Sequence, residues 1–204
     1  MNTSLRSTSR TLGVAVRALL MFTVVLGIGY TLLITGIGQL LMPSQSNGSL
    51  VRDADGDVVG SSLIGQSFTD EDGDPLPEYF QSRPSAAGDG YDGGASSGSN
   101  WGPENRDLIA AITERKAAIA KFNGVSEDEV PADAVTASSS GLDPHISPEY
   151  AAIQIDRVAE ARGVSADKVK QLVQQHTQGP DFGYLGESTV DVLELNLALD
   201  RLKG

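Results

Sequence analysis

The chain has 204 residues, carries a formal net charge of −12 at pH 7 and contains no cysteine, which excludes a disulfide framework and a thiolate metal site. All 27 acidic residues follow position 41, together with only 12 of the 15 basic residues, so this part carries about −15. That balance argues against binding to nucleic acid phosphates and against docking on anionic lipid head groups.

Residues 18–41 form a run of 24 uncharged residues near the N-terminus. At about 1.5 Å of rise per helical residue, the run reaches roughly 36 Å and can cross a hydrocarbon core about 30 Å thick. A cleaved signal peptide is the alternative, but its apolar stretch is usually about 7–15 residues long and ends at a small-residue site. Here the run is longer and ends in Leu40-Leu41-Met42-Pro43, so we expect an uncleaved transmembrane helix.

Arg6, Arg10 and Arg17 precede this helix with no acidic residue among them. Basic residues at a membrane end are retained on the cytoplasmic side, so the N-terminus is expected inside the cell. We therefore predict a cytoplasmic segment at 1–17, a membrane helix at 18–41, a linker at 42–49 and an extracytoplasmic domain at 50–204. The protein is then a single-pass protein of the cell membrane, and its outer part is long enough for one domain.

Residues 50–64 predict a β-hairpin, because two alternating apolar stretches flank an Asp-Gly pair. Leu50 and Val51 are assigned to the first strand. The second strand is expected to hold Val58, Val59, Leu63 and Ile64. The intervening Asp53-Ala-Asp55-Gly-Asp57 string lacks the spacing and terminal Glu of an EF-hand, so a tight turn is expected.

Residues 69–103 predict a long irregular region, acidic at first and then rich in glycine and serine. Loops of this length in a compact domain are usually functional or disordered. The embedded Tyr79, Phe80, Tyr91 and Trp101 indicate that this one packs against the rest of the domain.

The remainder predicts helices with two short strands, which gives a mixed α/β domain. Apolar spacing indicates a helix over 103–122, and 125–135 is expected to contain a strand. Ser147 before Pro148 is typical of a helix start, and Gly163 of its end. Ser165 is expected to begin a third helix that ends near 179, and 188–202 to form a strand and a final helix.

Catalytic motifs are missing from the sequence: it has no phosphate loop, no G-x-S-x-G and no H-E-x-x-H. Asp143, His145 and Ser138–Ser140 could be drawn as a hydrolase triad, but residues two apart in one loop rarely converge as such. We favour a turn that leads into the Ser147 cap, and we expect no catalytic residue, metal ligand or cofactor of the chain's own.

Two polar positions are candidates for binding. Arg83, followed by Pro84 and Ser85, could anchor a partner's carboxylate or backbone, or could hold the long loop through hydrogen bonds to carbonyls, which we favour. Gln154 and Arg157 lie one helical turn apart and so share a face, which we expect to be an exposed surface.

Five motifs in a fixed order carry a resemblance to a known family. They are D-G-x-V-V-G-S-x-L-I-G-Q-x-F at 55–68, Y-F-x-S-R-P-S-A at 79–86, A-S-x-G-S-N-x-G-P at 95–103, S-G-L-D-P-H-I-S-P at 140–148 and V-L-E-L-N-L-A-L-D at 192–200. With the single N-terminal span, this order resembles KdpC, the C subunit of bacterial potassium-transporting Kdp ATPases. The acidic stretch at 70–77 is longer than is usual in that family.

The resemblance implies a non-catalytic subunit of an ATP-driven potassium importer. Its implied partners are a KdpA-like potassium-binding subunit, a KdpB-like subunit that hydrolyses ATP, and a one-helix KdpF-like peptide. ATP and K⁺ are handled by the complex, since this chain has no Asp-Lys-Thr-Gly phosphorylation motif. The family's subunit is implied to be needed for assembly and to act as a catalytic chaperone that raises the ATP affinity of the hydrolysing subunit.

The resemblance and the arginine asymmetry differ on where the domain lies. A domain that helps to bind ATP should face the cytoplasm, and Gln154 would then be the residue expected to contact nucleotide. If it faces outside, the acidic domain is expected over the potassium entrance, where it stabilises the complex and biases cation access. We favour the second arrangement, which follows from this chain's own charges. The alternatives from other classes are a membrane-anchored extracytoplasmic hydrolase and a cation-binding module.

Overall fold

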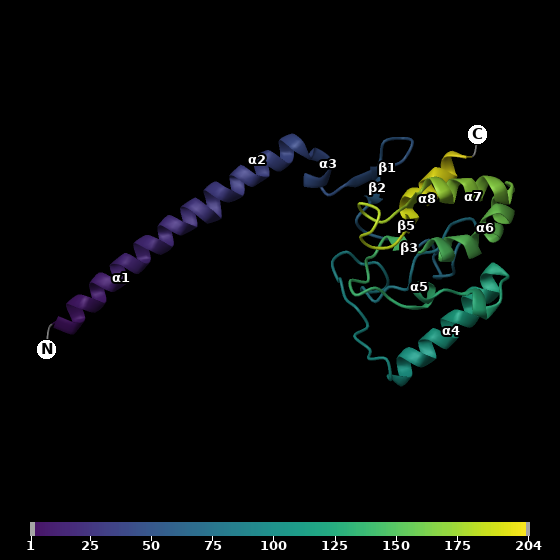
Figure 1. Cartoon of the computed structure of the whole chain (residues 1–204), viewed down its shortest axis with the longest axis horizontal. Helices are drawn as coiled ribbons and strands as arrows, with labels where there is room; N and C mark the ends of the chain where they lie inside the picture. The colour runs from purple at the N-terminus through teal and green to yellow at the C-terminus, as the bar shows by residue number, and fades with distance from the viewer. Residues whose placement is uncertain (1–2, 203–204) are drawn as a thin grey trace. The chain divides into compact units, whose positions relative to one another are not determined.

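The computed structural model describes residues 3–202, with side chains from Thr8 onward, and it divides into two units, Met1–Ser49 and Leu50–Gly204 (Figure 1). Residues 1–2 of the predicted cytoplasmic segment and 203–204 of the predicted domain lie outside the described residues.

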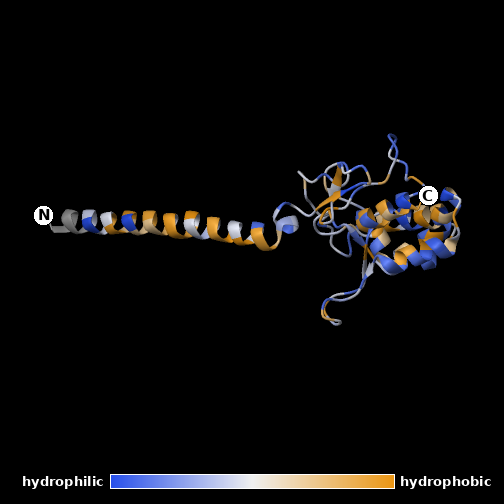
Figure 2. Ribbon diagram, turned by 90° about the horizontal axis from the view of Figure 1, so that it is seen from above, coloured by the Kyte–Doolittle hydropathy of each residue, from blue (hydrophilic) through white to orange (hydrophobic). Residues whose placement is uncertain are grey.

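The first unit is a long apolar helix, made of α1 (Thr3–Phe22), the π-helical stretch η1 (Thr23–Tyr30) and α2 (Thr31–Leu41). Its segment Thr8–Leu41 has 34 residues, a mean hydropathy of 2.2 and no buried part, so it is long and apolar enough to cross a membrane. Figure 2 shows this segment largely in orange. The predicted apolar helix is confirmed, and it begins before residue 18 because arginine favours helix.

The residues that follow α2 turn back and form hydrogen bonds with its last turn. Met42 leaves the helical region, and Pro43 opens the short helix α3 (Pro43–Ser46). Asn47 Nδ2 then donates to the carbonyl oxygen of Pro43 at 2.6 Å and to Oε1 of Gln39 at 3.1 Å. Gly38 permits this turn back, because a Cβ there would lie 2.8 Å from the hydroxyl of Ser46.

The second unit opens with the predicted hairpin, an antiparallel pair of β1 (Leu50–Arg52) and β2 (Val58–Ser61). The tight turn is also confirmed, because Asp53 Oδ1 accepts from the backbone N–H groups of Asp55 and Asp57 at 3.0 and 2.9 Å. The assignment of Leu63 and Ile64 to the second strand is wrong. The chain turns at Ser61, whose carbonyl accepts from the N–H of Ile64 at 3.2 Å.

The predicted helices are present as α4 (Arg106–Asn123), α6 (Pro148–Arg162) and α7 (Ala166–Gln175). The side chains of Asn105, Ser147 and Ser165 accept hydrogen bonds from the first turns of the three helices. Gly163 ends α6 with φ of +66°, a conformation that favours glycine. The third helix is shorter than predicted, because the chain turns at His176 into strand β4 (Thr177–Gln178).

The strand predicted within 125–135 is wrong. That segment forms a 3₁₀ turn, η2 (Glu127–Glu129), and a short helix, α5 (Ala132–Val135). The physical reason is local: Ser126 and Glu129 form a reciprocal capping box, which closes a helical turn.

A three-stranded antiparallel sheet in the order β3-β5-β4 joins β3 (His145–Ile146), β5 (Thr189–Asp191) and β4. Helix α8 (Val192–Arg201) follows β5 directly, capped by the side chain of Asp191. Its first turn lies near β2, because a Cβ on Gly60 would come within 2.8 Å of Leu193. The mixed α/β fold is therefore confirmed.

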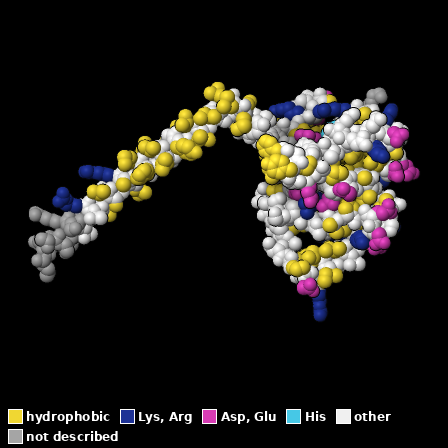
Figure 3. Space-filling view, viewed as in Figure 1, with side chains coloured by type: hydrophobic (Ala, Val, Ile, Leu, Met, Phe, Trp, Pro, Cys, Tyr) yellow, Lys and Arg dark blue, Asp and Glu magenta, His cyan; other side chains and the backbone are white. Residues whose placement is uncertain are grey.

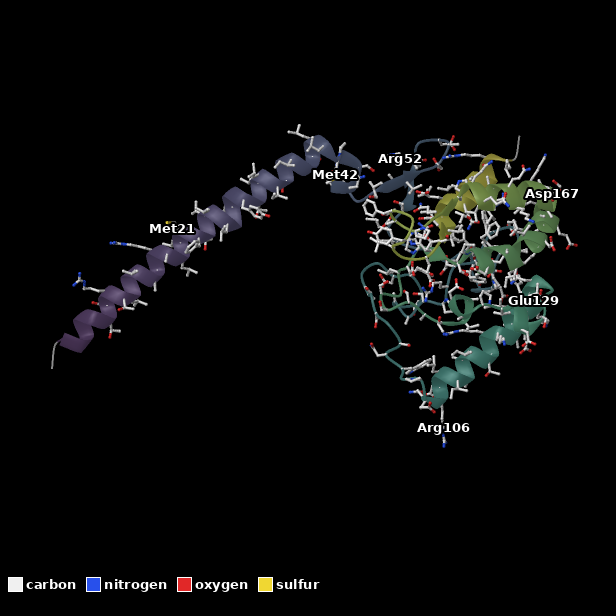
Figure 4. All side chains as sticks on the ribbon, in the orientation of Figure 1. Met21, Met42, Arg52, Arg106, Glu129 and Asp167 are labelled. Atoms are coloured by element: carbon white, nitrogen blue, oxygen red, sulfur yellow. The ribbon has the colours of Figure 1, made fainter. Side chains whose placement is uncertain are left out.

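The core lies among α6, α7, α8, β5 and the long irregular region. Its fully buried side chains include Phe80, Ile146, Val158, Val169, Val190, Leu195 and Leu199. Because Phe80 belongs to the core, the prediction that the aromatic-bearing loop packs against the domain is confirmed there. The labelled side chains of Arg106, Glu129 and Asp167 lie at the outside of this unit (Figure 4).

Candidate functional site

The segment 77–85 belongs to the long irregular region. It joins no sheet, yet Phe80 in its middle is fully buried. A buried backbone must find hydrogen-bond partners, because an unpaired N–H or C=O group away from water is costly. Side chains of α6 and α8 supply those partners.

Two amides each bond both backbone groups of one residue. Asn196 on α8 accepts from the N–H of Phe80 at 2.9 Å and donates to its carbonyl at 3.0 Å. Gln154 on α6 does the same for Gln81, at 2.7 and 3.2 Å. Asn196 and Gln154 are 1% and 0% exposed, so these bonds form away from water. We call this pair the amide clamp.

Two arginines of α6 extend the clamp toward residue 77. Arg157 donates to the carbonyls of Pro77 and Tyr79 and to Oδ1 of Asn123, and its guanidinium lies 4.4 Å from the ring centre of Phe122. Burial lowers the pKa of Arg157 to about 10, so this side chain still carries its charge at neutral pH.

Arg162 binds the same segment from a position five residues further along α6. It donates to the carbonyl of Glu78 and, at 3.0 Å, to the carboxylate of Asp200, and its guanidinium lies 4.7 Å from the ring centre of Tyr79. Its Nη1 is buried and, within the described residues, has no hydrogen-bond partner.

The expectation that Gln154 and Arg157 lie on an exposed helix face is wrong. Gln154 is fully buried, and its Oε1 also accepts from Arg157 at 2.8 Å, so the two residues bond each other and the segment beneath them. Helical spacing placed both on one face, but only the tertiary packing decided that segment 77–85 covers that face. Nucleotide contact by Gln154 stays a prediction, and it requires this amide to give up its present bonds.

The Arg83-Pro84-Ser85 motif joins the long loop to the segment 136–143. Arg83 donates to the carbonyl of Thr136 through Nε and Nη2, at 3.4 and 3.3 Å. Ser85 donates to the carbonyl of Gly141 at 2.6 Å and accepts from the N–H of Tyr91 at 2.9 Å. Arg83 therefore holds the loop through a carbonyl, which is the role that we favoured from the sequence. A contact between this motif and a partner protein stays a prediction.

Arg83, Asp143 and His145 form a charged cluster at the end of this motif. Arg83 Nη1 lies 2.9 Å from one oxygen of Asp143, and His145 Nδ1 lies 3.4 Å from the other. Burial alone would raise the pKa of the Asp143 carboxyl, but hydrogen bonds from His145 and the Arg83 charge lower it below its ordinary value. The hydrogen bond to Asp143 raises the pKa of His145, against the effect of burial.

The candidate triad is not assembled in the described part of the chain. There, the hydroxyls of Ser138 and Ser140 bond the turn that carries them and not His145. The hydroxyls of Ser138 and Ser140 lie 3.4 Å from each other and accept from the N–H groups of Gly141 and Leu142. The same atoms therefore support the turn that we favoured from the sequence.

A groove of about 420 Å³ lies between α4 and the segment 81–84. Arg83 and Arg115 contribute charge to it, and Ile119, Phe122 and Tyr150 contribute apolar surface. Arg115 is already engaged, because its Nη1 donates to the carbonyl of Val135 at 3.0 Å.

Sequence reasoning missed Asn196. The sequence did contain an indication: Asn196 is the amide residue in Leu193-Glu-Leu-Asn-Leu-Ala-Leu, at a position that shares a helix face with leucines. A lone amide on an apolar helix face indicates a buried group with a specific partner, because burial without hydrogen bonds is unfavourable.

Within the described residues, one apolar helix is long enough to span a membrane, and a mixed α/β domain whose buried polar side chains bind its own chain follows it. The class is therefore a protein with one candidate membrane-spanning helix and one compact domain. Comparison with known proteins specifies the class further. Residues 12–201 match the family model described as KdpC, the c chain of the K⁺-transporting ATPase.

Three relatives described as the potassium-transporting ATPase KdpC subunit illustrate the match. The protein of Mycobacterium tuberculosis is 52% identical over 189 residues, which cover 92% of this chain and 96% of the relative. That of Caulobacter vibrioides is 54% identical over 181 residues, covering 88% and 87%. That of Beijerinckia indica is 51% identical over 183 residues, covering 90% and 89%. The chain belongs to the KdpC family.

Proposed function

We propose that this chain is the accessory subunit of an ATP-driven potassium importer, required for assembly of the complex and for its normal ATP affinity. The observation that carries the proposal is the family match over residues 12–201, which includes both the apolar helix and the domain. In this proposal the partners are a potassium-binding subunit, an ATP-hydrolysing subunit and a small one-helix peptide, of the KdpA, KdpB and KdpF kinds.

The domain is proposed to lie outside the cytoplasm. Arginines precede the span and acidic residues follow it, an asymmetry that retains the N-terminus inside. The charges of the domain also suit a place beside the potassium entrance, where an acidic surface enriches cations. An effect on ATP affinity is then indirect, and it acts through contacts with the subunit that hydrolyses ATP.

Purification through a C-terminal tag, in mild detergent, tests assembly. The expected result is co-purification of a potassium-binding subunit and an ATP-hydrolysing subunit, with ATP hydrolysis that K⁺ stimulates. Complexes prepared without this chain should lose subunits or show a higher apparent KM for ATP. A tagged chain that purifies alone, or that itself hydrolyses ATP, would contradict the proposal.

A further inference from the structure

The loop 179–188, between β4 and β5, exposes an apolar surface that the fold does not use. Phe182 is 88% exposed, Tyr184 76% and Leu185 50%. Single exposed apolar residues are ordinary, but three within four positions form a patch of the kind that marks an interaction site. Figure 3 shows hydrophobic side chains gathered over this loop.

The loop holds these side chains outward in a defined shape. The N–H of Asp181 donates to the carbonyl of Leu185, and the N–H of Leu185 to that of Asp181, both at 2.9 Å. Phe182 has φ of +53°, a left-handed conformation that is uncommon for a bulky residue. A turn closed by its own hydrogen bonds loses less conformational freedom on binding than an open loop does, which favours affinity.

The charges within the loop and along its flanking sequence favour one kind of surface as its partner. The sequence has no lysine or arginine between Lys170 and Arg201, whereas Asp181 and Glu187 flank the aromatic residues. Anionic lipid head groups would repel this loop, and so would the same loop of a second copy. An apolar recess with a basic rim, on another protein, complements both its rings and its charges.

We propose that Phe182 and Tyr184 insert into such a recess on a water-exposed surface of another subunit of the same potassium-transporting ATPase. The inference rests on the proposed function, since it requires that the chain assembles with those subunits. Buried aromatic residues at the centre of an interface often dominate its binding energy. Acidic residues at the rim chiefly favour the correct partner and speed association.

Site-specific crosslinking in the intact complex tests the contact. Because the chain has no cysteine, Phe182→Cys and Tyr184→Cys each provide a single attachment point for a photoreactive maleimide. The matched control is Ile109→Cys on α4, an apolar side chain that is 51% exposed in its native form. Crosslinks from 182 and 184 to another ATPase subunit, identified by mass spectrometry and several-fold stronger than from 109, are the expected result.

A second variant measures what the rings contribute. Phe182→Ser with Tyr184→Ser should reduce retention of the other subunits about tenfold or more in salt and detergent washes. Ile109→Ser should leave retention unchanged, and all variants should keep the wild-type melting temperature, because these side chains lie outside the core.

The outcomes separate the two proposals. If the wild-type chain retains no other subunit, the proposed function fails. If it retains them but positions 182 and 184 crosslink only to lipid, only to a second copy or to nothing, the docking surface is wrong and the proposed function stands. Unchanged retention by the double variant would also overturn the docking surface.

Discussion

Gln154 and Asn196 give the segment 77–85 the hydrogen bonds that a neighbouring strand would otherwise give. Each amide satisfies both the N–H and the C=O of one residue of this segment, which a carboxylate cannot do because it only accepts hydrogen bonds. The two helices that carry them are therefore fixed to the same stretch of chain, and the Arg83 motif forms the end of that stretch.

Replacing Gln154 by alanine should destabilise the domain, because it leaves both backbone groups of Gln81 without a partner. The expected loss in free energy of unfolding is about 2–4 kcal/mol, from the lower part of the range of about 1–3 kcal/mol for each of the two unpaired groups, because these bonds are part-buried. Chemical denaturation of the detergent-solubilised protein measures it. Gln174→Ala, at an exposed position of α7, is the matched control and should change stability by less than about 0.5 kcal/mol.

The Asp143–His145 contact predicts a pH dependence. His145, with a raised pKa, contributes stability below its unfolded value of about 6.5 and loses it as pH rises through the folded value. Asp143, with a lowered pKa, contributes above about 3.9 and loses it as pH falls through its folded value. The pair therefore stabilises the domain most between these limits.

Asp143→Asn should lower the pKa of His145 toward its ordinary value and weaken the stabilisation at pH 5 relative to pH 8. NMR titration of the imidazole, assigned with a His145→Gln variant, measures the first effect. Asp128→Asn removes an exposed carboxylate that pairs with Lys116, and it should leave the His145 titration unchanged. An unaltered pKa in Asp143→Asn would show that the contact does not control this histidine.

Among the elements, α6 contacts strand β5 and the helices α4 and α7, and it carries Gln154 of the amide clamp. Its start is fixed by Ser147, whose hydroxyl accepts from the N–H of Tyr150 at 3.0 Å and donates to Asp133 at 2.9 Å. The N–H of Ser147 also donates to that carboxylate, at 2.7 Å. Asp133 belongs to α5, so one serine joins two helices.

Ser147→Ala should therefore cost more than an ordinary cap, which is about 1 kcal/mol. We expect a loss of about 1.5–3 kcal/mol, because the variant also leaves Asp133 short of a donor. Ser165→Ala is the matched control: its hydroxyl caps α7 at 3.4 Å, and no carboxylate in the described residues bonds it, so the loss should stay below about 1 kcal/mol. Equal melting temperatures for the two variants would contradict the added role of Asp133.

For the whole molecule, the distribution of charge along the chain is the property on which orientation depends. Arg6, Arg10 and Arg17 lie before or within the start of the apolar helix, and the strongly acidic unit follows it. Dark blue side chains near the N-terminal end of the helix are visible in Figure 3.

Replacing Arg6, Arg10 and Arg17 by glutamine should lower the fraction of chains with the domain outside the cytoplasm, because the positive-inside bias is lost. Reporter fusions at the C-terminus, one active only in the cytoplasm and one active only outside, measure that fraction. Arg106→Gln removes an exposed basic residue of the domain and should leave it unchanged. A wild-type fusion active only in the cytoplasm would overturn the proposed topology.

The sequence predicted the structure correctly where interactions between neighbouring residues determine it. The apolar helix, the Asp-Gly turn, the starts of the helices at Asn105, Ser147 and Ser165, and the end of α6 at Gly163 all follow from interactions within a few positions of the chain. The error within 125–135 is of the same local kind, because the capping box of Ser126 and Glu129 was overlooked.

Composition and residue order along the chain are enough to recognise the apolar helix of membrane-spanning length, the charge asymmetry and the family motifs. The burial of Gln154, the bonds between Asn196 and Phe80 and the contact of Arg83 with Asp143 depend on the folded domain, because these partners lie 73, 116 and 60 positions apart. Helical periodicity shows which residues share a face. What covers that face depends on how distant segments pack, and no local pattern records it.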